Sequence, residues 1–272
     1  MEFLDHAGCR LAYERRGHGS PIVFVPGGAC THRDWDSQLD GLSDAFTVVA
    51  IDARGHGASA VDDPATCTVE NMAADINALV DHLDLGPAVL VGHSFSCRLV
   101  LQAADSQSET TAGVVLVDGS RVWTGTRAEA VTSATAIVAD IRGFFEKVFD
   151  APAFFVQADA ENRKRIHDSM LTVPDDVLVA TTLSTAPWDA EDFERVVGSL
   201  KVPLLALQST FWNEKATRRS LRADETTTPW LDLLRTLKPD TQITLIPEIG
   251  HFAMIEAPEI VNAEIRRFAT AT

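Results

Sequence analysis

Short apolar runs, each closed by a turn residue, alternate along this chain with patterns typical of helices. A run that is apolar at every position is typical of a strand buried on both faces of a sheet. We therefore expect an α/β fold with a mostly parallel, doubly wound sheet. An alternating segment at 11–15 predicts an additional edge strand. Buried strands are expected at 22–25, 47–51, 89–91, 114–117, 204–207 and 243–246, and helices at 35–42, 69–85, 95–104, 230–237 and 258–268.

The segment 121–192 breaks this alternation. It is helical in character and has no convincing buried strand, so we interpret it as a helical cap inserted over the sheet, with 1–120 and 193–272 as the core. Helices of the cap are expected at 134–149, 160–170 and 174–184. The candidates for aromatic contacts with a substrate are Trp123, Phe144, Trp188 and, outside the cap, Trp212.

The charge of the chain restricts its partners. Among 272 residues 39 are acidic and 23 basic, a formal net charge of −16 that disfavours nucleic acid. No apolar run approaches the roughly 18 residues that span a bilayer, and residues 1–16 lack the apolar core of a signal peptide. The four cysteines have no metal-site spacing and indicate free thiols. We expect a soluble, cytoplasmic protein that acts on a small molecule; a homodimer is compatible with the sequence.

A serine stands at the turn between a predicted strand and a predicted helix. The apolar run ends at Gly92, Ser94 follows two residues later, and a helical stretch begins near Cys97. Such a nucleophile elbow exposes a hydroxyl on a strained backbone, which makes Ser94 a candidate nucleophile. The usual pattern is G-x-S-x-G, and Ser96 replaces its last glycine. The alternative interpretation is an ordinary turn with a helix-capping serine.

A serine nucleophile needs a histidine base. His251 follows the last predicted strand, on a loop that reaches the carboxyl edge of the sheet. The other histidines fit this role less well, because they lie beside the serine or in loops. A histidine that only caps its loop is the alternative.

Four motifs in this order resemble those of the α/β-hydrolase fold family. They are Pro26-Gly27-Gly28, the loop 52–59 with its Asp-x-Arg-Gly-His-Gly-x-Ser pattern, the elbow at Ser94, and Gly250-His251-Phe252. The resemblance covers nearly the whole chain outside the cap. It implies a hydrolase with a serine, a histidine and an acid, and it says little about the substrate.

The position of the acid departs from the common family pattern. The usual aspartate position, after the strand at 204–207, falls on Trp212, and its only acidic neighbour is Glu214. Some lactonases and cofactor-free dioxygenases of this fold instead place the acid after the strand that follows the nucleophile. Asp118 stands there, 24 residues after Ser94, and we predict it as the acid. Glu214 is the alternative, and Asp118 would then be a turn residue.

The resemblance also implies an oxyanion hole of two backbone N–H groups. One belongs to Phe95, just after the nucleophile. The other comes from the loop after Val25, where Gly28 is the candidate and Ala29 the second choice. A plain turn at Gly27 and Gly28 is the alternative interpretation.

The leading prediction is a cofactor-free serine hydrolase that cleaves an ester or lactone of a small, largely apolar substrate. The alternatives are a cofactor-independent ring-cleaving dioxygenase, a C–C bond hydrolase and a non-catalytic ligand receptor. Dehalogenation is disfavoured because its nucleophile is normally an aspartate. No residues have the spacing of metal ligands, and no glycine pattern indicates a phosphate cradle.

Overall fold

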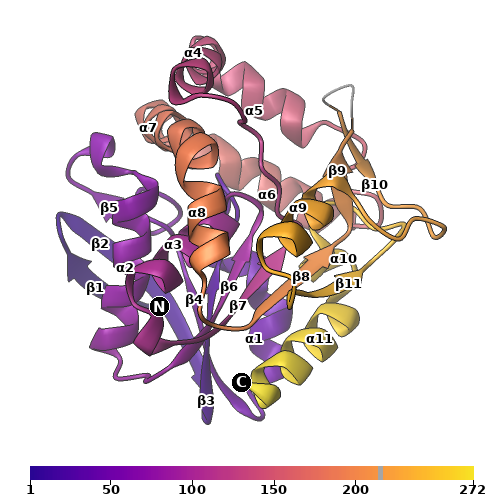
Figure 1. The fold of residues 1–272 in the computed structure, drawn as a ribbon. Helices are drawn as coiled ribbons and strands as arrows, with labels where there is room; N and C mark the ends of the chain where they lie inside the picture. Colours follow the sequence, from indigo (N-terminus) through magenta and orange to yellow (C-terminus); the bar gives the residue numbers. More distant parts are fainter. Residues whose placement is uncertain (214–216) are drawn as a thin grey trace.

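A mixed sheet forms the centre of the molecule. The computed structural model describes residues 1–213 and 217–272, and within them the strands run in the order β1-β2-β4-β3-β6-β7-β8-β11 (Figure 1). From β4 onward all neighbours in this order are parallel. The strands are β1 Glu2–His6, β2 Cys9–Gly17, β3 Ser20–Val25, β4 Phe46–Ile51, β6 Ala88–His93, β7 Thr111–Val117, β8 Leu204–Gln208 and β11 Gln242–Leu245.

The amino-terminal strands differ from expectation. The strand predicted at 11–15 is part of β2, which is not at the edge, because β1 pairs on its outer side in antiparallel register. The short strand β5 (Ala60–Val61) also pairs with β2. β1 is half exposed and has no continuous apolar run, so it lacks the signal that identified the buried strands.

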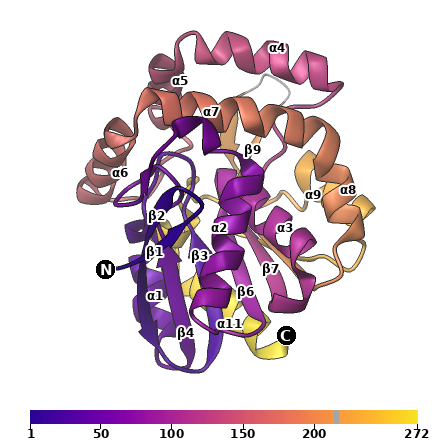
Figure 2. The ribbon, with the colours of Figure 1, turned by 90° about the vertical axis from the view of Figure 1, so that its left-hand side faces the viewer.

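Helices cover both faces of the sheet, as expected for a doubly wound fold. Figures 1 and 2 show α2 (Val69–His82) and α3 (Cys97–Ser106) on one face and α1 (Asp36–Leu42) and α11 (Pro258–Ala271) on the other. The side chains of β4 and β6 are buried throughout, because each strand has a helix layer on both sides. α8 (Phe193–Ser199) and α9 (Pro229–Leu237) follow further along the chain.

A group of helices lies beyond the carboxyl ends of the parallel strands (Figure 1). It comprises α4 (Arg127–Val138), α5 (Ile141–Phe149), α6 (Ala160–Thr172), α7 (Asp175–Pro187) and a π-helical turn, Trp188–Asp192. The single helix predicted at 134–149 was wrong. Two helices replace it, because Asp140 caps a new amino terminus by accepting a hydrogen bond from the Gly143 N–H.

A small hairpin follows β8. Its strands β9 (Thr210–Trp212) and β10 (Arg218–Ser220) pair antiparallel, with Arg218 opposite Trp212. Glu214, the alternative acid, lies outside the described residues. Within the described part of the chain, no helix combines the length and apolar character needed to cross a lipid bilayer.

Candidate active site

Ser94 lies on a sharp turn between β6 and α3. Its φ is +53°, a left-handed conformation that side chains other than glycine rarely adopt. The turn is tight because the strand runs close to the helix start: a Cβ on Gly92 would lie 2.4 Å from the Ser96 carbonyl oxygen. Ser96, which stands where the motif has glycine, is buried and donates its hydroxyl hydrogen bond to the Pro26 carbonyl. It thereby ties the turn to the loop after β3.

His251 lies between Ser94 and Asp118. Its Nε2 is 2.8 Å from Ser94 Oγ, and its Nδ1 is 2.5 Å from Asp118 Oδ2. With Nδ1 protonated, the ring donates to Asp118 and its Nε2 can accept the serine proton. The backbone N–H of His251 donates to the carbonyls of Ala153 and Phe154, which fixes the loop that carries the ring.

Asp118 is fully buried at the end of β7, with φ at +48°. Its Oδ1 accepts hydrogen bonds from the Ser209 and Thr210 N–H groups at 2.9 and 2.7 Å and from Gln208 Nε2 at 3.1 Å. Burial raises the pKa of this carboxyl, but the hydrogen bond and charge of His251 and the charge of Arg218 outweigh it and lower the pKa to about 2. Asp118 is therefore ionised whenever His251 is neutral.

Arg218 is a site residue that the sequence analysis missed. Its Nη1 lies 3.0 Å from Asp118 Oδ2, 2.7 Å from Thr210 Oγ1 and 3.0 Å from His251 Nδ1. It stands beside Arg219 in the short strand β10, far from every motif, and gave no signal in the sequence. Burial lowers the pKa of its guanidinium, which stays charged at neutral pH.

This cation acts on the imidazole beside it. Burial and the charge of Arg218 lower the pKa of His251 to about 4, although the Asp118 carboxylate acts in the opposite direction. His93, whose ring centroid is 4.6 Å from that of His251, is kept neutral because burial lowers its pKa well below the usual value. The imidazole of His251 beside Ser94 is therefore neutral over the physiological pH range.

The two candidate oxyanion donors lie next to each other. Phe95 is in the first turn of the 3₁₀ helix Ser94–Ser96, where the leading N–H groups have no partner within the helix. A Cβ on Gly28 would lie 3.4 Å from Phe95 Cβ. Ala29, the second choice, has φ at +60° in a turn closed by the Cys30 N–H and the Gly27 carbonyl. Gly28 and Phe95 both line the cavity that contains Ser94.

That cavity has a volume of about 510 Å³ and lies between the sheet edge and the helices α4, α5 and α7. Of the predicted substrate contacts, Trp123, Phe144 and Trp212 line it. Further apolar lining comes from Ile137, Phe145, Val148, Phe149, Phe154 and Phe252, and polar lining from Thr181, Thr182 and Thr185.

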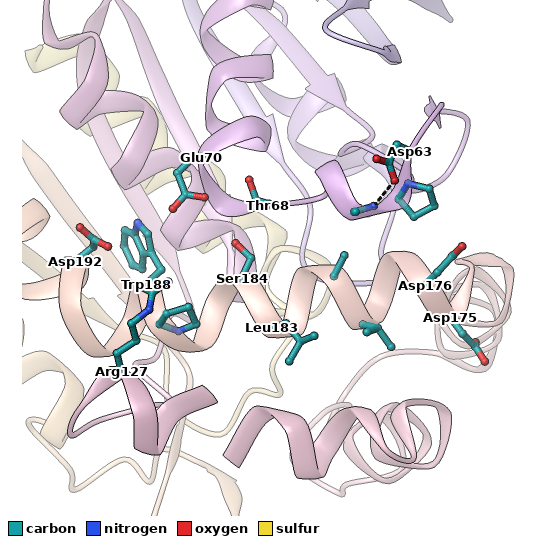
Figure 3. A pocket seen from close by; sticks show the side chains of 15 residues that line it. Asp63, Thr68, Glu70, Arg127, Asp175, Asp176, Leu183, Ser184, Trp188 and Asp192 are labelled. Atoms are coloured by element: carbon teal, nitrogen blue, oxygen red, sulfur yellow. Dashed lines mark hydrogen bonds between the residues drawn. The ribbon is translucent and has the colours of Figure 1, made fainter. Parts of the chain in front are cut away.

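Trp188 does not line this cavity, which corrects that prediction. It is 1% exposed, and its Nε1 donates to Gln102 Oε1 on α3 at 2.8 Å. Its ring borders a different groove, of about 900 Å³, beside α7 (Figure 3). The π-helical turn that begins at Trp188 changes the direction in which side chains leave the helix, which helical periodicity does not predict.

No group of three or more His, Cys, Asp or Glu side chains in the described ranges is placed to hold a metal ion. All four cysteines are free, buried thiols.

A hydroxyl, a neutral imidazole and a carboxylate lie within hydrogen-bond distance in this order, the arrangement that a serine nucleophile requires. The chain belongs to the alpha/beta hydrolase family, whose model matches residues 22–264. The fold class expected from the sequence is thus confirmed.

Known proteins similar to this chain differ in their activities. The dihydrolipoyllysine-residue acetyltransferase component of the acetoin cleaving system of Cupriavidus necator is 34% identical over 43% of this chain, and the match spans only 31% of that protein. A putative non-heme bromoperoxidase of Mycobacterium tuberculosis is 26% identical, over 95% of this chain and 97% of its own length. A thermophilic esterase from Thermogutta terrifontis superimposes with a TM-score of 0.79 at 25% identity, covering 97% of this chain and 94% of that one.

Proposed function

We propose that the protein is a cofactor-free hydrolase of carboxylic esters or lactones, with Ser94 as nucleophile. His251 Nε2 takes the proton of the Ser94 hydroxyl as Oγ attacks the substrate carbonyl carbon. Asp118 holds the Nδ1–H tautomer and stabilises the imidazolium that forms. The tetrahedral intermediate collapses to an acyl-enzyme when His251 returns the proton to the leaving alkoxide.

The second half of the reaction uses the same groups. A water molecule gives a proton to His251 Nε2 and attacks the acyl carbon, and the proton then returns to Ser94 Oγ as the acid leaves. The N–H groups of Gly28 and Phe95 are the proposed donors to the oxyanion in both tetrahedral intermediates. A lactone would follow the same steps, with the leaving oxygen still attached to the acyl group.

One observation above all supports this proposal. Ser94 Oγ lies 2.8 Å from His251 Nε2, the Nδ1 of the same ring lies 2.5 Å from Asp118 Oδ2, and both Ser94 and His251 line the cavity. The resemblance to the thermophilic esterase is consistent with it. The aromatic lining supports a substrate with a largely apolar body, since Phe144, Phe149 and Phe154 all face the same space.

The proposal is tested with a fluorophosphonate probe and a panel of 4-nitrophenyl esters and lactones. The wild type is expected to be labelled on Ser94 and to hydrolyse at least one ester; Ser94→Ala should lose both properties. Ser106→Ala, an exposed serine on α3, is the matched control. Full activity in Ser94→Ala, or turnover that consumes oxygen, would refute the acyl-enzyme and favour the dioxygenase alternative.

A further inference from the structure

The charged residues that line the catalytic cavity are all basic. In a chain with 39 acidic and 23 basic residues, the described lining contains Arg98, Arg121 and Arg218 and no aspartate or glutamate. The groove of Figure 3 shows the opposite balance: one arginine, Arg127, and the acidic residues Asp63, Glu70, Asp175, Asp176 and Asp192. Basic groups on low-dielectric walls raise the local concentration of anions, so what matters is how much of this positive charge is left unbalanced by the protein.

Two of the three cavity arginines are neutralised by partners of their own. Arg98 forms two hydrogen bonds with the carboxylate of Asp189, at 2.6 and 2.7 Å. Arg121 binds Glu194 Oε1 at 2.6 Å through Nη1. Their charges are therefore largely balanced before a ligand arrives.

The positive charge of Arg218 is balanced less completely by the protein. Its carboxylate partner among residues 1–213 and 217–272 is Asp118, which also accepts hydrogen bonds from His251, two backbone N–H groups and the Gln208 amide. The hydrogen bonds of Arg218 all leave from Nη1, and its buried Nε has no hydrogen-bond partner among the described residues. Within the described part of the chain, the Nε–Nη2 edge, which is the edge that binds a carboxylate through two parallel hydrogen bonds, is thus unused.

We propose that the substrate is an ester or lactone that also carries a carboxylate, and that Arg218 is the residue that recognises this second group. This inference rests on the proposed function. An arginine buried among Phe154 and Trp212, with ring centroids 6.0 and 5.1 Å from its Cζ, gains more from an anion than an exposed one, because water competes less.

The position of Arg218 gives the anion a second effect. The guanidinium is in contact with His251 Nδ1, so it opposes the positive charge that the imidazole gains when it takes the Ser94 proton. A carboxylate bound to Arg218 offsets that repulsion. An anionic substrate should therefore have a higher kcat, as well as a lower KM, than its uncharged counterpart. Tighter binding of the substrate alone would lower only KM.

The test compares matched substrates that differ in charge. Mono-4-nitrophenyl adipate and 4-nitrophenyl hexanoate differ in a terminal carboxylate that replaces a methyl group on the acyl side; 3-carboxyphenyl and phenyl butyrate differ on the alcohol side. The wild type is expected to prefer the anionic member of at least one pair by about tenfold or more in kcat/KM, with part of the gain in kcat.

The ratio of kcat/KM for the anionic substrate to kcat/KM for the uncharged one isolates the role of the charge. Any damage to the proposed triad lowers both values together and leaves their ratio unchanged. Arg218→Met should reduce the preference to about one, and Arg218→Lys should retain part of it. Arg127→Met, in the acidic groove, is the matched control and should leave the ratio unchanged. If Arg218→Met does not fold, Arg218→Lys tests the same claim, because it keeps the charge but loses the paired donors, and its preference should fall below that of the wild type.

The outcomes separate this inference from the proposed function. Ser94-dependent hydrolysis without any preference for the anionic substrates overturns the inference and leaves the hydrolase intact. A preference that persists in Arg218→Met also overturns it, because another group must then recognise the anion. Absence of Ser94-dependent hydrolysis refutes the proposed function itself.

Discussion

Arg98 on α3 and Asp189 in the π-helical turn form a buried, bidentate ion pair. Nε and Nη2 of Arg98 lie 2.6 and 2.7 Å from the two carboxylate oxygens, and Asp189 is completely shielded from solvent. Asp189 Oδ2 also accepts hydrogen bonds from the N–H groups of Val122 and Trp123. One carboxylate thus holds both ends of the helical segment 121–192 against the helix that follows Ser94.

Removing one partner of this ion pair should destabilise the folded protein. Asp189→Ala leaves Arg98 buried without a counter-charge, and we expect the free energy of unfolding to fall by about 3–5 kcal/mol. Urea denaturation measures this. Glu191→Ala, which removes the exposed partner of Arg127, is the control and should change stability by less than about 1 kcal/mol. If both substitutions lowered the free energy of unfolding equally, burial of the ion pair would not determine the cost of breaking it.

The acid of the proposed triad can be identified by substitution. Asp118→Asn should lower kcat by about 10³- to 10⁴-fold, because the amide no longer favours the tautomer in which His251 accepts the Ser94 proton. Glu214→Ala should retain activity within about threefold. Steady-state kinetics on both variants decide the matter, and the reverse pattern would assign the acid to Glu214.

The pH dependence of kcat/KM should show the effect of the Arg218 charge on the pKa of His251. Only the neutral imidazole accepts the Ser94 proton, and His251 has its pKa lowered to about 4, so kcat/KM should fall only as the pH drops toward that value. Arg218→Met removes a positive charge that disfavours the imidazolium. The acid limb should then move to higher pH, by about one unit or more, measured with an uncharged ester. An unchanged or lower midpoint would show that Arg218 does not act on His251.

Two adjacent glycines should respond differently to a methyl group. A Cβ on Gly27 would lie 2.8 Å from His93 Nδ1, and the His93 ring packs on His251 and contacts its carbonyl through Nε2 at 2.9 Å. Gly27→Ala should therefore displace the base and lower kcat by roughly tenfold or more. Gly28→Ala meets Phe95 at an ordinary contact distance and should unfold at nearly the wild-type urea concentration. A larger loss of kcat in Gly28→Ala than in Gly27→Ala would contradict this geometry.

Much of the fold followed from local patterns. The buried strands have apolar runs because each is covered on both faces, so β6 and β7 were recognisable from composition alone. Ser94, His251 and Asp118 were predictable as a group because Ser94 and Asp118 directly follow strands, His251 lies on the loop after one, and the carboxyl ends of parallel strands meet at one edge. The structure brings these three together at hydrogen-bond distance; their catalytic roles stay a proposal.

What could not be predicted depends on tertiary contacts. Arg218 reaches the site only because the β9–β10 hairpin folds back over Asp118, and no periodicity indicates that turn. Trp188 was wrongly assigned to the substrate cavity because the sequence shows that the cap contains aromatic residues but not which of them pack against the core, as Trp188 does through Gln102 on α3. β1 lies in the sheet through its pairing with β2, not through its own apolar character.

The position of Asp118 on β7 has a consequence for how such a protein can change. The segment after β8 supplies none of the three proposed catalytic side chains, so it can be lengthened, shortened or exchanged without deleting one of them. Thr210 and Arg218 are the exceptions, because both donate hydrogen bonds to the acid. A graft that replaces 210–220 with a loop from another hydrolase should therefore transfer selectivity for the ligand only if it brings a new donor for Asp118 Oδ2. The proposed catalytic and selectivity residues thus lie on different stretches of chain, joined by the hydrogen bonds that Thr210 and Arg218 donate to Asp118.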